Sequence, residues 1–118
     1  MSLMENVLKF NRKSYKRDYI DKRKATCIIN KLAEDGNNVK YSVHAKERLV
    51  ERGFTYNDML TILRDGVVRE EPQYDTDKQS WTYSVDFIKF NGNRDARCVA
   101  VIQKKNKLFV ITVMWIDL

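Results

Sequence analysis

The sequence has 118 residues, of which 43% are hydrophobic and 32% are charged, and its formal net charge is +6. This composition is typical of one soluble globular domain and argues against a disordered chain. No apolar run approaches the roughly 20 residues that span a bilayer, and the N-terminus has no apolar signal region. We therefore expect a cytoplasmic protein that does not contact a membrane.

The positive charge is concentrated at the start of the chain. Residues 1–31 contain nine Lys and Arg against three Asp and Glu, so this segment has a net charge of +6 and the remainder is neutral. Such a basic segment favours an anionic partner, nucleic acid first, although a lysine-rich helix face exposed to solvent has the same composition. The predicted nucleic-acid contacts are Arg12, Lys13, Lys16, Arg17, Lys22, Arg23 and Lys24.

The two cysteines, Cys27 and Cys98, lie far apart and have no metal-binding spacing. In a reducing cytosol this favours two buried free thiols over a disulfide. We expect no metal site and no cofactor.

The first clear helix begins at Lys22. Apolar residues recur there at helical spacing, and Gly36 with the following asparagines ends the pattern. The apolar positions are Ala25, Ile28, Ile29, Leu32 and Ala33. We expect residues 1–40 to form a basic N-terminal helical segment and residues 41–118 to form an α+β domain, the two making one compact unit.

Two short helices follow, and their ends carry capping signals. Ser42 is suited to cap a helix over Val43–Arg52, which Gly53 closes. Thr55 and Asp58 have the spacing of a capping box for the next helix, and Gly66 ends that helix. Flanking these caps, Phe54 and Met59 have the spacing of a hydrophobic staple.

After residue 66 the apolar period changes to two, which indicates strands. We predict four strands, over residues 67–71, 81–87, 97–103 and 108–115, with polar turns at residues 73–80, 91–93 and 104–107. The last strand is apolar almost throughout, so we expect it to be central and covered on both faces. The predicted fold class is α+β, with N-terminal helices packed on a four-stranded antiparallel meander.

The second helix carries a row of polar side chains. His44, Arg48 and Arg52 are spaced i, i+4 and i+8, so they form one stripe, and the stripe borders the apolar positions Ala45 and Leu49. Two guanidinium groups one turn apart can hold a phosphate. Histidine is the side chain whose unperturbed pKa lies near neutrality.

These residue types can serve metal-free RNA cleavage, which needs a base for the 2′-hydroxyl, cations for the charge on phosphorus and an acid for the leaving oxygen. One histidine cannot be both acid and base without a partner, so Arg97, Tyr83 or Tyr74 would complete the set from the sheet. The alternative is structural: His44 hydrogen-bonds locally, and the arginines tie the helix to strand carboxylates such as Asp86.

The order of motifs resembles a known family. His44-Ala45-x-x-Arg48-x-x-x-Arg52-Gly53, a capped helix ending in Asp65-Gly66 and a final strand with Val110-Ile111-Thr112-Val113 are similar to a small bacterial domain family of unknown function, usually grouped with RelE-like toxins. The resemblance covers residues 41–116. It implies a RelE-like fold and an mRNA-cleaving or ribosome-directed toxin held by an antitoxin, with His44, Arg48 and Arg52 at signature positions.

Three hypotheses follow. The first is an endoribonuclease toxin that uses the stripe on residues 44–52. The second is a non-catalytic module that binds nucleic acid or a protein through residues 9–24 and the same arginines. The third is an accessory protein, from a mobile element, whose sheet edge pairs with a partner strand. The sequence leaves the oligomeric state open.

Overall fold

The computed structural model describes residues 19–104 and 106–116. This part of the chain contains three α-helices, one 3-10 turn and six strands. The helices are α3 (Lys22–Leu32), α4 (Val43–Arg52) and α5 (Tyr56–Asp65), and the turn is η1 (Gly36–Asn38). The strands are β1 (Val39–Tyr41), β2 (Val67–Val68), β3 (Gln73–Asp75), β4 (Ser80–Asn91), β5 (Arg94–Gln103) and β6 (Lys107–Trp115).

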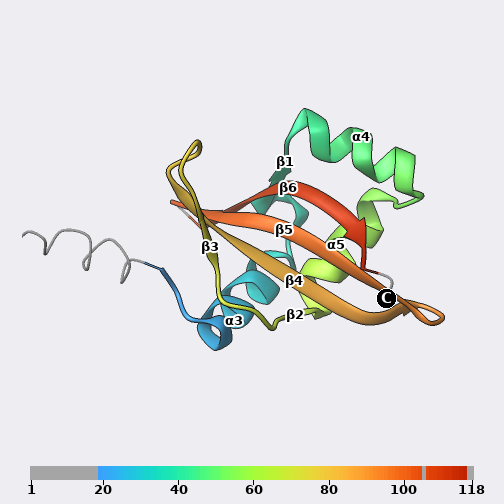
Figure 1. Cartoon of the computed structure of the whole chain (residues 1–118), viewed down its shortest axis with the longest axis horizontal. Coiled ribbons are helices and arrows are strands. Elements are labelled where there is room, and N and C mark those ends of the chain that lie inside the picture. The colour runs from blue at the N-terminus through green and yellow to red at the C-terminus, as the bar shows by residue number, and fades with distance from the viewer. Residues whose placement is uncertain (1–18, 105, 117–118) are drawn as a thin grey trace, which may run out of the picture.

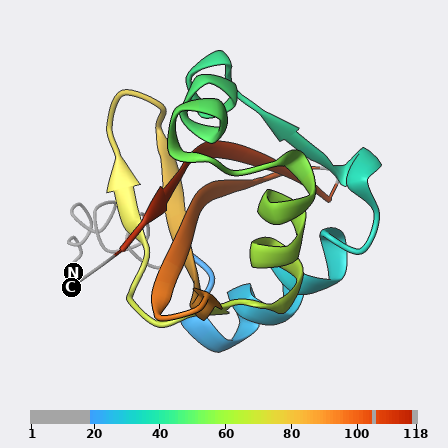
Figure 2. The ribbon, with the colours of Figure 1, turned by 90° about the vertical axis from the view of Figure 1, so that its right-hand side faces the viewer.

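All six strands belong to one sheet. Its order is β1-β6-β5-β4-β2, and β3 also pairs with β4. The long strands β4, β5 and β6 form the predicted antiparallel meander, whereas β1 runs parallel to β6. Figures 1 and 2 show the sheet curving around α5, with α3 and α4 on either side of α5. The fold class is therefore α+β.

The sheet has two more strands than predicted. β1 has only three residues and lies between two helices, which is too short to show a period-two pattern in the sequence. It is recognised as a strand only by its parallel pairing with β6. β3 lies in the polar stretch that we expected to be a turn, and the strand predicted over residues 67–71 is paired only at Val67–Val68. Between β2 and β3, residues 69–72 oppose only two residues of β4. This bulge interrupts the edge strand.

The predicted ends of α4 and α5 are confirmed, whereas α3 ends at Leu32, before the predicted stop at Gly36. Ser42 Oγ accepts a hydrogen bond from the Ala45 N–H at 3.0 Å. Gly53 closes α4 in the left-handed conformation with φ of 77°, which glycine adopts without strain. Thr55 and Asp58 form the reciprocal capping box at the start of α5.

Glycine at position 66 is not explained by a left-handed backbone conformation, which is the usual reason for glycine at a helix end. Its backbone is extended, with φ of −84°, so no left-handed conformation requires glycine there. A Cβ at this position would lie 2.5 Å from the Ile62 carbonyl oxygen and 2.8 Å from Val85 Cγ1. Glycine is therefore needed because the end of α5 closely approaches β4.

One core lies between the helices and the sheet. Ile29 from α3, Leu49 from α4 and Met59 from α5 are buried against alternate residues of β4, β5 and β6. Phe54 also lies in this core, next to the α4–α5 corner. Because α3 contributes Ala25 and Ile29 and its C-cap Ala33 is buried with them, the described part of the basic segment packs into the same unit as the rest.

Two further expectations differ from the structure. β6 has a neighbour on each side, but only one of its faces is buried, since alternate residues are partly exposed. Cys98 is buried as predicted, whereas Cys27 is exposed because it lies on the outer side of α3.

No helix in residues 19–104 and 106–116 is long and apolar enough to cross a membrane. Within the same ranges, no group of three or more His, Cys, Asp or Glu residues could hold a metal ion.

Candidate functional site

His44 lies in the first turn of α4 and faces solvent. Its side chain is 82% exposed, and Nδ1 lies 3.7 Å from Glu47 Oε1. Among the described residues, this is its one polar side-chain contact. The imidazole is thus accessible to a ligand, but no described side chain holds it in a fixed orientation.

The two arginines of the stripe have different surroundings. Arg48 forms an ion pair of 2.9 Å with Glu51, one turn along the exposed surface of α4. Arg52 instead donates from Nη1 to the Val113 carbonyl at 2.7 Å, and its own carbonyl accepts a hydrogen bond from Trp115 Nε1 at 2.8 Å. Arg52 therefore fastens the end of α4 to β6. The structural alternative holds for this residue, although its partner is a backbone carbonyl and not a carboxylate.

Arg97 forms an ion pair with Asp86, which is the buried charged residue in the part of the chain that the structure describes. Arg97 donates from Nε to Asp86 Oδ1 at 2.6 Å and from Nη2 to Oδ2 at 3.0 Å. Arg69 approaches Asp86 Oδ2 from the bulge at 2.8 Å, and Glu70 lies 3.4 Å from Arg97. The hydrogen bonds to Asp86 raise the pKa of the Arg97 guanidinium above its ordinary value, although its partial burial acts to lower it.

Tyr83 is on the helix-covered face of β4 and is 2% exposed. Its hydroxyl oxygen accepts a hydrogen bond from the Ile20 N–H at 2.8 Å, which fixes the chain just before α3. Burial raises the pKa of the Tyr83 phenol above its ordinary value. Tyr83 opposes Ala100 while Arg97 opposes Asp86, so Tyr83 and Arg97 lie on opposite faces of the sheet.

The five residues proposed for catalysis are therefore not gathered at one point. Within residues 19–104 and 106–116, no hydrogen bond or ion pair joins any two of them. His44 and Arg48 share the exposed side of α4, Arg52 and Arg97 are bound to the sheet, and Tyr83 is in the core.

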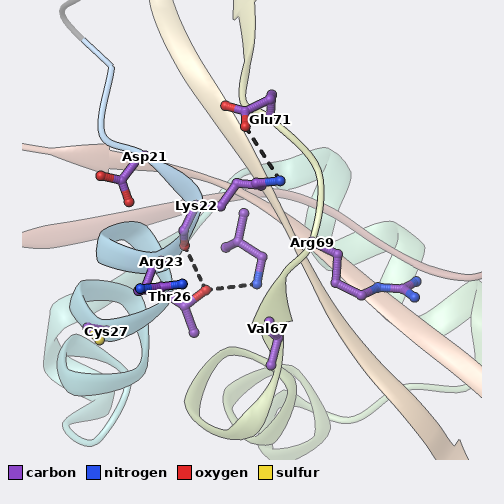
Figure 3. Close-up of a pocket in the computed structure, with 9 residues that line it drawn as sticks. Asp21, Lys22, Arg23, Thr26, Cys27, Val67, Arg69 and Glu71 are labelled. Carbon is purple, nitrogen blue, oxygen red and sulfur yellow. Dashed lines mark hydrogen bonds and ion pairs between the residues drawn. The ribbon is translucent and has the colours of Figure 1, made fainter.

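The predicted nucleic-acid contacts Lys22, Arg23 and Lys24 form the first turn of α3. Arg12, Lys13, Lys16 and Arg17 lie outside the described residues. An open groove of about 640 Å³ runs between this turn and β2, as Figure 3 shows. Its lining is Asp21, Lys22, Arg23, Thr26, Cys27, Val67, Val68, Arg69 and Glu71.

Hydrogen bonds between side chains of α3 and the backbone of its neighbours join the two walls of this groove. Thr26 Oγ1 donates to the Lys22 carbonyl at 2.9 Å and accepts from the Val68 N–H at 3.0 Å, so α3 is joined directly to β2. One turn along, Asn30 Nδ2 donates to the carbonyls of Leu63 and Gly66. The two walls are thereby held at a fixed separation.

The cations of the groove differ in how they are paired. Lys22 Nζ lies 3.5 Å from Glu71 in a pair that is largely exposed. In Figure 3 the Arg69 guanidinium points away from the groove, toward Asp86. Arg23 forms no hydrogen bond or ion pair through its side chain with any other described residue. The groove thus presents one cation that is not used by the fold.

The position of these cations on α3 also matters. The first turn of α3 contains no acidic residue and three basic ones, and the carboxylates of the cap Asp21 and of Glu71 lie beside them. The N-terminal end of a helix carries partial positive charge, so cations are disfavoured there. Helix stability therefore does not account for Lys22, Arg23 and Lys24.

A second, less polar groove of about 440 Å³ lies on the other side of α3. Its lining is Cys27, Ile28, Lys31, Leu32 and Asn106, and Cys27 is common to both grooves. Thr26, Arg69 and Glu71 were not predicted as groove residues. The bulge that positions Arg69 and Glu71 follows from strand pairing and not from a sequence motif.

A known domain family covers most of the described structure. Residues 41–115 match DUF4258, a domain of unknown function. The chain belongs to the DUF4258 family. The match begins at the end of β1 and covers the sheet from β2 to β6, so α3 and its basic first turn precede the DUF4258 domain while packing on it. No curated protein and no solved structure gave a significant match.

Proposed function

We propose that this DUF4258 protein is a nucleic-acid-binding module that contacts phosphates at the first turn of α3. The observation that carries the proposal is Arg23, which lines an open groove, forms no ion pair with any described residue and belongs to a turn of three cations that the helix dipole disfavours. A phosphate placed there would interact with both the cations and the helix N-terminus. In the sequence, residues 1–31 have an excess of six positive charges, which also favours a polyanionic partner.

Salt dependence distinguishes phosphate-driven binding from nonspecific adsorption through apolar surface. Affinity for a fluorescent single-stranded RNA, measured by anisotropy, should fall steeply with salt, because each neutralised phosphate releases counterions. Arg23→Glu should weaken binding by about tenfold and lower the salt slope by about one. Its matched control is Lys40→Glu, which makes the same charge change on β1 at the opposite edge of the sheet.

Two outcomes would overturn the proposal. The first is a wild-type protein that does not bind RNA or DNA at about 50–100 mM salt, where phosphate-driven binding is visible. The second is an equal loss of affinity in Arg23→Glu and Lys40→Glu, which would assign the effect to net charge alone.

RNA cleavage is the second candidate, and it rests on His44. If the relation to RelE-like toxins holds, this 82% exposed imidazole on the side of Arg48 is the group that can act as acid or base on a bound RNA. A toxin of this kind would bind mRNA or the ribosome, and an antitoxin would restrain it. Arg97 and Tyr83 would contribute only if the sheet face or the core became accessible.

The test compares the wild type and His44→Ala after induction in a bacterial host. The toxin hypothesis predicts that the wild type arrests growth and degrades message, and that His44→Ala does neither while it accumulates to the same level. Normal growth and intact message with both proteins would contradict the hypothesis. Arrest by both would show that His44 is not the catalytic group.

A further inference from the structure

Three aromatic side chains pack together beside the groove at the start of α3. The Trp81 ring of β4 lies 4.9 Å from the Tyr19 ring and 5.2 Å from the Tyr74 ring, measured between ring centroids. Tyr19 belongs to the chain just before α3, and Tyr74 belongs to β3. Both separations fall in the range of about 4.5–7 Å that is favourable for aromatic pairs. The three rings therefore form one cluster, in which Trp81 contacts both tyrosines.

The cluster is next to the groove because its two tyrosines adjoin residues that line it. Tyr19 precedes Asp21 by two residues, and Tyr74 follows Glu71 by three. Consecutive Cα atoms are about 3.8 Å apart, so the Tyr19 Cα lies within about 8 Å of the Asp21 Cα, and the Tyr74 Cα within about 11 Å of the Glu71 Cα. In Figure 3 the chain before Asp21 and the chain after Glu71 both run upward from the groove. A linear ligand that leaves the groove on this side would meet the aromatic cluster.

Part of the Tyr19 side chain remains available after the fold has used it. The Tyr83 hydroxyl accepts a hydrogen bond from the Ile20 N–H at 2.8 Å, so the residue after Tyr19 is held to β4 through its backbone. Tyr19 itself is 37% exposed, and within residues 19–104 and 106–116 its hydroxyl forms no hydrogen bond. Packing against Trp81 needs only apolar area, and the exposed part of the Tyr19 ring can contact a ligand.

A partly exposed tyrosine is ordinary on a protein surface, so the class of ligand is indicated by what surrounds Tyr19. Arg23 lies four residues further along the chain, in the first turn of α3, and lines the groove. Proteins that bind single-stranded nucleic acid combine cations that follow the backbone with aromatic rings on which the bases stack. A duplex keeps its bases paired and stacked on one another, so it would offer only phosphates to this surface. The combination of Arg23 with Tyr19 therefore favours a single strand.

We propose that the groove at the start of α3 binds single-stranded nucleic acid, with a phosphate at Arg23 and a neighbouring base stacked on the Tyr19 ring. This inference rests on the phosphate-binding function proposed above and adds the class of nucleic acid that the groove takes. Trp81 supports the Tyr19 ring in its position. Every base has a π-face, so stacking of this kind tolerates different sequences and both RNA and DNA strands.

The test removes the ring from the protein and the bases from the ligand. The anisotropy probes are an RNA strand of about 12 nucleotides, the DNA strand of the same sequence, its duplex, and an abasic DNA strand of the same length. Tyr19→Leu keeps an apolar contact with Trp81 but has no π-face, so it should bind both single strands about tenfold more weakly than the wild type. Its affinity for the abasic strand and the duplex should be unchanged. Tyr19→Trp, which keeps an aromatic ring, should bind like the wild type.

Salt dependence separates the stacking contact from the phosphate contact. Tyr19→Leu removes no charge, so its affinity for the single strands should be lower at every salt concentration while its salt slope stays that of the wild type. Arg23→Glu should instead lower the slope by about one. At about 200 mM salt, where the electrostatic contribution is weakened, the wild type should bind the single strands more tightly than the duplex.

The matched control is Tyr41→Leu. Tyr41 is 36% exposed, its ring lies 5.6 Å from the Tyr56 ring, and it belongs to β1 at the opposite edge of the sheet. This variant should bind every probe like the wild type, and circular dichroism confirms that each variant is folded.

Three results would overturn the stacking contact while the phosphate contact at Arg23 stands. They are unchanged binding of the single strands by Tyr19→Leu, an equal loss in Tyr19→Leu and Tyr41→Leu, and a loss in Tyr19→Leu that is as large on the abasic strand as on the strands with bases. A wild type that binds none of the probes would overturn both this inference and the proposed function.

Discussion

Two groups of basic side chains in this protein have the same chemistry and opposite surroundings. Arg52, Arg69 and Arg97 lie against the sheet and donate to a backbone carbonyl or to the buried Asp86. Lys22, Arg23 and Lys24 lie at the start of α3, where the only ion pair among the described residues is the exposed contact between Lys22 and Glu71. The first group holds the fold together, and the second is available to a partner.

The difference shows how little residue type alone reveals about a role. Arg52 belongs to the motif that carries the family resemblance, yet its guanidinium is used to fasten α4 to β6. Arg23 belongs to no motif, and it is the cation of the open groove that has no ion pair within the part of the chain that the structure describes. If the division is correct, substitutions in the first group should lower stability, and substitutions in the second should weaken binding without lowering stability.

The largest effect is expected for Asp86→Ala. The Asp86 side chain is 1% exposed and accepts hydrogen bonds from two guanidinium groups, so its removal leaves Arg97 without its partner in a partly buried site. Loss of one partner of a buried ion pair typically costs about 3–5 kcal/mol, and the half-exposed Arg69 reduces this to about 2–4 kcal/mol. Urea denaturation measures the change. Asp77→Ala, in an exposed turn, is the control, and equal midpoints for the two variants would contradict the role of Asp86.

A smaller loss is expected for Arg52→Ala. This change removes the 2.7 Å hydrogen bond to Val113 and frees the end of α4, at a cost of about 1–2 kcal/mol. Arg48→Ala removes only an exposed pair with Glu51 and should change the free energy of unfolding by less than about 0.5 kcal/mol. Thermal and urea denaturation of the two variants give the comparison. A larger loss for Arg48→Ala would mean that the roles of the two arginines are reversed.

The helices could be predicted from the sequence because their signals are local. Ser42, Gly53, Thr55 and Asp58 lie within a few residues of the helix ends that they define, and the structure confirms them. The apolar spacing from Ala25 onward gave α3 for the same reason. Strands β1 and β3 were missed because they are short edge elements whose partners lie far along the chain.

The candidate site was less predictable, since the partner of each cation is set by tertiary packing. Arg52 and Arg48 are equally spaced along α4, and only the position of β6 decides that Arg52 reaches Val113. Likewise, alternation in β4 and β5 indicated which residues share a face, but not that Tyr83 receives the Ile20 N–H and is closed off from solvent. The groove beside α3 depends on a bulge in the edge strand, which the sequence does not reveal.

Lys24→Glu, in the first turn of α3, should raise stability, whereas Asp86→Ala and Arg52→Ala should lower it. Lys24→Glu replaces a cation with an anion in the first turn of a helix that has no acidic residue there. The change should stabilise the protein by about 0.3–1 kcal/mol through the helix dipole. The same variant should bind RNA more weakly than the wild type, measured by anisotropy at low salt. A variant that is both less stable and weaker in binding would place Lys24 among the cations that the fold requires.

The smallest effect on stability is expected for His44→Ala. A small effect allows a loss of activity to be assigned to the imidazole itself. Because the imidazole is 82% exposed and its contact with Glu47 is 3.7 Å long, the free energy of unfolding should change by less than about 0.5 kcal/mol. Chemical denaturation of the purified variant measures this directly. A stable His44→Ala protein that no longer arrests growth would therefore have lost chemistry and not structure. A marked loss of stability would instead assign His44 to the first group, together with Arg52, and would remove it as a catalytic candidate.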